Sequence, residues 1–158
     1  MAPTLWIDAD GCPNEIKQVV FRASQRLGLP AVLVANVPLA TPRWPLVKLA
    51  LVSHDFDAAD DHIAEHAAAG DVVITADIPL AARVVEKGAV AINPRGEVYD
   101  ERNVGRHLAT RNLMQDLRAA GAIHGGPPPL RPSDKARFAA ALDRTLTRAL
   151  KAARRPTP

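Results

Sequence analysis

Short apolar runs that alternate with stretches of helical spacing constrain this chain more than any other feature. The apolar runs predict strands at residues 5–7, 31–35, 71–75 and 89–92, with a weaker one at 49–52. The helical spacing between them predicts helices at residues 13–27, 57–69 and 79–87. Strands that alternate with helices through short connections form a mainly parallel sheet with helices on both faces. The expected fold is therefore a three-layer α/β fold.

The second half of the chain is expected to add helices rather than strands. Residues 93–99 are predicted to form a loop, and residues 121–132 an extended linker. A helix at 101–119 is expected to turn four apolar residues inward: Val104, Leu108, Leu113 and Leu117. A last helix is expected from about 133 to 153, followed by a disordered tail at 154–158. Since 158 residues is the usual size of one domain, residues 1–153 are predicted to form a single domain.

Polar residues follow several of the predicted strands at the point where each strand ends. They are Asp8, Asn36, Thr75 with Asp77, and Asn93. In parallel sheets the ligand binds outside the carboxyl ends of the strands. The sequence therefore predicts a site at this edge, in which Thr75 and Asn36 orient water or ligands.

Carboxylates dominate this predicted site. Asp8 and Asp10 lie two residues apart and are joined by Asp77, with Asp60 or Asp61 from the helix at 57–69. Carboxylates this close together do not all stay ionised without a cation. Oxygen ligands suit Mg²⁺ or Mn²⁺, so Asp8, Asp10, Asp60 and Asp77 are predicted to hold one of these ions. One of the first two aspartates is also a candidate cap for the helix that follows.

Long motifs in the chain resemble the YaiI/YqxD family of bacterial proteins. They are Trp6–Pro13, Val34–Asn36, Gly70–Ala81 and Asn93–Gly96, and the resemblance continues through Arg111 to the Gly-Gly-Pro at 125–127. That family is similar in turn to the PIN-like nuclease fold. The resemblance implies a metal site made by Asp8 or Asp10, by Asp60 or Asp61, and by Thr75 with Asp77. It also implies a metal-dependent phosphodiesterase that cleaves RNA or DNA.

Two other functions fit parts of the same pattern. Asp8-Ala9-Asp10 resembles the start of haloacid-dehalogenase-type phosphatases, in which the first Asp is the nucleophile. The chain departs from that pattern at Cys12, and no clear lysine motif precedes the strand at 71–75. The other alternative is a non-catalytic protein that binds nucleic acid or nucleotides. Cys12 itself is expected to be structural or a neighbour of the site, because no cysteine or arginine partner stands at the spacing that thiol chemistry requires.

Positive charge collects at the end of the chain. Residues 1–130 carry a net charge of −3, and residues 131–158 carry +6. Arg144, Arg148 and Lys151 are therefore predicted to contact nucleic acid, although a solvated helix face would give the same pattern. Arg95 and Gly96, together with Gly125-Gly126, are candidates to bind a phosphate near the site, since glycine lets backbone N–H groups approach an anion. Plain turns would give the same pattern.

The sequence also predicts a cytoplasmic protein without a membrane segment. A single cysteine rules out a disulfide within the chain and fits a reducing compartment. The N-terminus lacks the basic and apolar regions of a signal peptide. No stretch approaches the roughly 18 apolar residues of a transmembrane helix.

Overall fold

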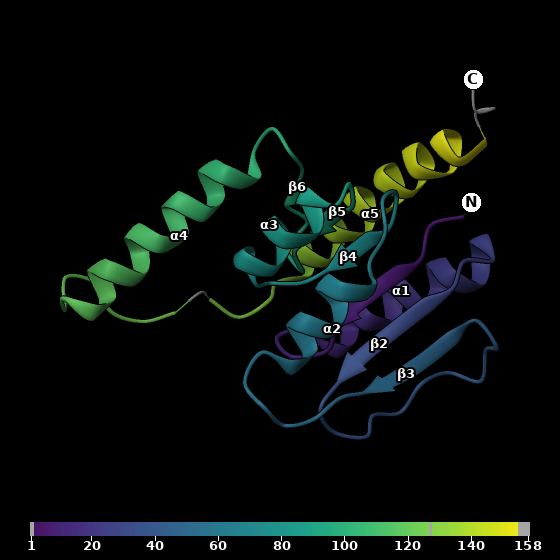
Figure 1. The fold of residues 1–158 in the computed structure, drawn as a ribbon, viewed down its shortest axis with the longest axis horizontal. Coiled ribbons are helices and arrows are strands. Elements are labelled where there is room, and N and C mark those ends of the chain that lie inside the picture. The colour runs from purple at the N-terminus through teal and green to yellow at the C-terminus, as the bar shows by residue number, and fades with distance from the viewer. Residues whose placement is uncertain (1, 127, 155–158) are drawn as a thin grey trace.

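A computed structural model describes residues 2–126 and 128–154 and contains a six-stranded, mainly parallel sheet (Figure 1). The strands lie in the order β3-β2-β1-β4-β5-β6, and only β6 runs antiparallel to its neighbour. Their bounds are β1 Leu5–Asp8, β2 Ala31–Ala35, β3 Val47–Leu51, β4 Val72–Ile74, β5 Val90–Ile92 and β6 Val98–Tyr99. The predicted mainly parallel sheet is confirmed.

Helices cover both faces of the sheet. Their bounds are α1 Asn14–Leu27, α2 Ala58–His66, α3 Ile78–Glu86, α4 Val104–Ala119 and α5 Pro132–Arg154. One core packs α1 and α5 on the first face, through side chains such as Ile16 and Phe138. The other packs α2 and α3 on the second face, through side chains such as Ile63 and Leu80. These three layers are the predicted α/β arrangement and are consistent with a PIN-like fold.

The side chain of Asp71 fixes β4 against β1. Its carboxylate is buried and accepts hydrogen bonds from Trp6 Nε1 and the backbone N–H of Thr4, both at 3.0 Å, and from Ala68 N at 2.9 Å. This places Leu5 opposite Val72 and Ile7 opposite Ile74. Because the starts of the two strands are aligned, their carboxyl ends meet at the same level.

The prediction of a loop at 93–99 was wrong for its last two residues. Val98 and Tyr99 form β6, which pairs with β5 and is the edge strand of the sheet. The side chain of Asn93 shapes the turn between them by accepting hydrogen bonds from Arg95 N at 2.9 Å and Glu97 N at 3.0 Å. A strand of two residues is too short to show an alternating pattern, so no periodic signal predicts it.

Of the four apolar residues of α4 predicted to turn inward, only Val104 packs against a core among the described residues, and Leu108, Leu113 and Leu117 do not. None of the helix is buried, and Leu113 is 57% exposed. Figure 1 shows α4 extending away from the sheet, in contact with α3 near its first turns. Because the other four helices already cover both faces of the sheet, the apolar stripe beyond Val104 finds no core to enter.

Gly96 is the tightest point of contact between the β5–β6 turn and α5. Its φ is +92°, and an added Cβ would lie 2.7 Å from the carbonyl carbon of Arg137. We expect Gly96→Ala to lower the free energy of unfolding by about 3 kcal/mol, because backbone strain and a steric clash act together. Gly125→Ala is the control: φ is +84° there, but nothing lies within 4 Å of the added atom. It should cost about 1 kcal/mol in the same denaturant titration. Equal losses would exclude the clash.

The predicted helix bounds are close at most ends, but the helix predicted at 57–69 ends at His66, and the one predicted at 101–119 begins at Val104. The helix expected to end near residue 153 ends at Arg154, and the rest of the predicted tail, residues 155–158, lies outside the described residues. In the described part of the chain, no helix is both long and apolar enough to cross a membrane.

Candidate functional site

A pocket of about 720 Å³ opens at the carboxyl edge of the sheet, where β1 and β2 end and α2 begins. The four predicted carboxylates all line it: Asp8, Asp10, Asp60 and Asp77. Asn36 lines the same pocket from the end of β2. The structure therefore brings together residues that are up to about 70 positions apart in the sequence.

Asp8 lies deepest, at the last position of β1, and is only 4% exposed. Its Oδ2 accepts a hydrogen bond of 2.9 Å from the hydroxyl of Thr75. Its Oδ1 is buried and finds no hydrogen-bond partner among the described residues. Burial raises the pKa of Asp8 to about 6, and the negative charges of Asp10 and Asp77 add to the increase. An unpaired buried carboxylate oxygen is costly, so this atom marks the place where a ligand would be stabilising.

Thr75 joins the deep carboxylate to the rim. Its hydroxyl donates to Asp8 and accepts a 3.0 Å hydrogen bond from the backbone N–H of Asp77. Asp77 in turn caps α3, with Oδ1 accepting from Leu80 N at 3.0 Å. Both hydrogen-bonding functions of the Thr75 hydroxyl are used inside the protein, so it positions Asp8 and Asp77 rather than facing the pocket itself.

The structure distinguishes the two adjacent aspartates of α2. Asp60 lines the pocket, whereas Asp61 is exposed and pairs with Arg83 at 2.9 Å. The pKa of Asp60 is raised to about 7, mainly by partial burial and then by the negative charges of Asp77 and Asp8. Near neutral pH, ionising both Asp8 and Asp60 is therefore unfavourable unless a positive charge is present.

The segment before α2 adds features that the sequence analysis missed. Phe56 lines the pocket mouth and is 94% exposed. The next residue, Asp57, is the single non-glycine residue with positive φ in the described ranges, at 62°. Such strain persists where the surrounding structure or a function requires it. The available signal was an isolated aromatic residue in a stretch of histidine and aspartate.

The donor set suits a hard divalent cation, but it is not assembled around one. Across residues 2–126 and 128–154, no three acidic, histidine or cysteine side chains are arranged so that they could hold an ion. Mg²⁺ usually keeps several waters and uses only one or two carboxylates directly. The unpaired Oδ1 of Asp8 and the mutual repulsion of the carboxylates are the observations that fit such an ion.

Other predicted ligand residues lie elsewhere. Arg95 and Gly96 do not line the pocket. They belong to the β5–β6 turn, where the N–H of Gly96 is already donated to the carbonyl of Asn93 at 3.0 Å. Arg144, Arg148 and Lys151 are exposed on α5, and Arg148 lies beside Val72 and Val90, which begin their strands. Figure 1 shows this end of α5 directed away from the carboxyl ends of β2 and β3.

Together these observations define a mainly parallel α/β protein with a carboxylate-lined pocket at the carboxyl edge of its sheet. The chain belongs to the YaiI/YqxD family: residues 6–148 match the family described as "Uncharacterized BCR, YaiI/YqxD family". No solved structure matches it.

The relatives extend over nearly the whole chain. A UPF0178 protein of Trichlorobacter lovleyi is 57% identical over 152 residues, which cover 96% of this chain and 99% of the relative. One from Geobacter sulfurreducens is 55% identical, covering 93% and 98%. Another from Psychromonas ingrahamii is 52% identical, covering 94% and 98%. The predicted family is confirmed.

Proposed function

We propose that this protein is a divalent-metal-dependent phosphodiesterase that acts on RNA or DNA. The observation that carries the proposal is the buried Asp8, whose Oδ1 has no partner in the described part of the chain and whose neighbours in the pocket are further carboxylates. Such a site is unfavourable alone and becomes favourable with a cation.

The side chains of the pocket have separate roles in this proposal. Asp8, Asp10, Asp60 and Asp77 would hold Mg²⁺ or Mn²⁺, one or two of them directly and the others through bound water. The ion would supply a charge that neutralises a phosphate and lowers the pKa of a water molecule. Thr75 keeps Asp8 and Asp77 in place through its two hydrogen bonds. Asn36, exposed at the end of β2, would orient water or the substrate.

Phe56 favours nucleic acid over a small phosphate ester. An aromatic ring that is 94% exposed contributes nothing to the core. Stacking of a base on such a ring contributes about 1–3 kcal/mol without requiring a particular sequence. Its place at the mouth of the carboxylate pocket puts that surface beside the proposed reaction centre.

The test is cleavage of a short single-stranded RNA and of a generic phosphate monoester, each with Mn²⁺ or with EDTA. We expect the RNA to be cut with Mn²⁺ only. Release of phosphate from the monoester alone would favour a phosphatase instead. Binding of the RNA and of Mn²⁺ without any cleavage would favour the non-catalytic alternative, and activity that survives EDTA would exclude the proposed mechanism.

Cys12 is expected to be dispensable for this activity. The thiol is buried, and burial raises its pKa to about 12, so it stays protonated at neutral pH. Cys12→Ser should therefore retain most of the RNA cleavage rate. Loss of cleavage in a variant that still unfolds cooperatively and still binds Mn²⁺ would instead assign the chemistry to the thiol.

A further inference from the structure

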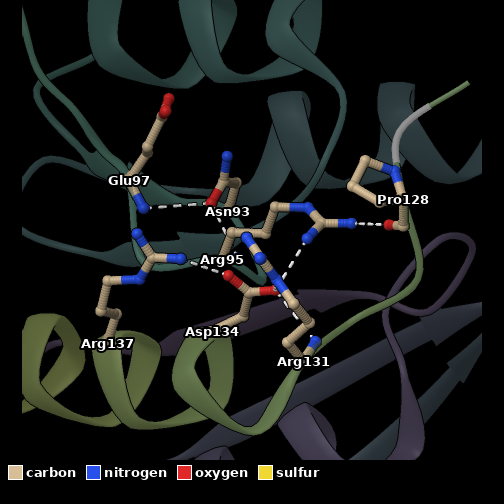
Figure 2. A network of polar contacts seen from close by, with 7 residues as sticks. All are labelled: Asn93, Arg95, Glu97, Pro128, Arg131, Asp134 and Arg137. Atoms are coloured by element: carbon tan, nitrogen blue, oxygen red, sulfur yellow. Dashed lines mark hydrogen bonds and ion pairs between the residues drawn. The ribbon is translucent and has the colours of Figure 1, made fainter.

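Three arginines surround one buried carboxylate where α5 begins (Figure 2). Asp134 is fully buried, and its Oδ2 accepts hydrogen bonds from Arg95 Nη1 at 2.7 Å and from the backbone N–H of Arg131 at 2.9 Å. Its Oδ1 accepts from Arg137 Nη2. We call Arg95, Arg131, Asp134 and Arg137 the arginine cluster.

The arginine cluster has more positive charge than its own structure requires. The side chain of Arg95 is only 29% exposed, and its guanidinium also donates to the carbonyl of Pro128, so it connects the β5–β6 turn to the linker before α5. The backbone N–H of Arg131 and the side chains of Arg137 and Arg95 keep the pKa of Asp134 below its usual value. One negative charge thus faces three positive ones.

Arg131 and Arg137 provide the excess. Their side chains are 67% and 62% exposed, so most of their N–H donors face water. The side chain of Arg131 approaches Asp134 no closer than 3.9 Å, from Nε to Oδ2, which is beyond hydrogen-bonding distance. A guanidinium held on one side by a fixed carboxylate keeps its other donors free for a phosphate.

The arginine cluster lies at the same edge of the sheet as the carboxylate pocket. Arg95 follows the carboxyl end of β5, and β5 is the neighbour of β4, which leads to Asp77. Strands lie about 4.8 Å apart, so the ends of β1 and β5 are about 10 Å apart. This is the separation of the strand ends, and Arg131 and Arg137 lie beside the end of β5, at the start of α5.

We propose that Arg131 and Arg137 bind a backbone phosphate of the same single strand whose phosphodiester lies at the carboxylate pocket. The inference rests on the proposed function for its substrate class. It replaces the prediction that Arg95 and Gly96 contact the phosphate directly: these two residues build the support, and the two exposed arginines make the contact.

The test is binding of a fluorescein-labelled single-stranded RNA to the full chain by fluorescence anisotropy in EDTA, so that neither metal nor cleavage is needed. The double variant R131Q/R137Q is compared with R144Q/R148Q. Each double variant removes two positive charges: R131Q/R137Q removes them at the start of α5, and R144Q/R148Q removes them further along the helix. We expect R131Q/R137Q to weaken binding by about tenfold and to reduce the log–log salt slope by about 0.7, the value for one lost phosphate contact on a single strand.

The controls make each outcome decisive. R144Q/R148Q should change affinity less than R131Q/R137Q, and R131K/R137K should restore part of the loss because it keeps the charge without the planar fork. Circular dichroism checks that each variant is folded. Equal losses in the two double variants, or no RNA binding by the wild type at low salt, would overturn the inference. Binding that depends on Arg131 and Arg137 without any Mn²⁺-dependent cleavage would retain it and remove the proposed function.

Discussion

Asp60→Asn is expected to reduce metal-dependent RNA cleavage by at least about 100-fold. Mutating a residue that only hydrogen-bonds to a metal ligand already lowers metal affinity or activity by about 10- to 100-fold. The physical reason is the loss of a charged oxygen ligand from the pocket with little change in shape. Asp61→Asn is the matched control, because Asp61 is the next residue of the same helix and faces away toward Arg83. It should keep its activity within about threefold, since exposed ion pairs contribute little.

The same pair of variants separates a catalytic effect from a structural one. Asp60→Asn removes a carboxylate that its neighbours repel, so the metal-free variant should be at least as stable as the wild type near neutral pH. The measurements are initial cleavage rates with Mn²⁺ and thermal unfolding with EDTA. If both variants lose activity equally, the claim that Asp60, and not Asp61, acts in catalysis is wrong.

The strands and the site edge could be predicted because they depend on local patterns. A strand such as Val72–Ile74 is buried on both faces, so its residues have to be apolar. The polar residues that follow such a strand lie at the carboxyl edge of the sheet. That reasoning places Asp8 and Asp77 together without any coordinates. The hydroxyl of Thr75 that joins them is equally local, because it lies two residues before Asp77.

Orientation around a helix axis could not be predicted in the same way. Asp60 and Asp61 are chemically identical neighbours, and only the packing of α2 shows that the first faces the pocket. The same limit explains α4, whose apolar stripe predicts burial although the sheet has no free face. The arginine cluster joins Arg95 in the β5–β6 turn to residues at the start of α5, and no sequence spacing indicates that contact.

The stability of the metal-free protein is expected to fall as the pH rises from about 5 to about 8. The folded-state pKa values of Asp8 and Asp60 are raised from 3.8 to about 6 and about 7. Their stabilising contribution is complete below pH 3.8 and is lost as the pH passes through these raised values. For Asp8, the loss between pH 5 and pH 8 is about 1.4 kcal/mol.

Mn²⁺ should reverse this loss, because it binds the ionised carboxylates and not the protonated ones. At about 100 times its dissociation constant it would stabilise the fold by about 2.7 kcal/mol near pH 8, and by much less near pH 5. The measurement is thermal unfolding of wild type and Asp8→Asn at both pH values, with Mn²⁺ or EDTA. Histidines also titrate in this range, so the difference between the two proteins isolates Asp8. A Mn²⁺ shift that is the same at both pH values, or the same in Asp8→Asn, would place the ion away from this pocket.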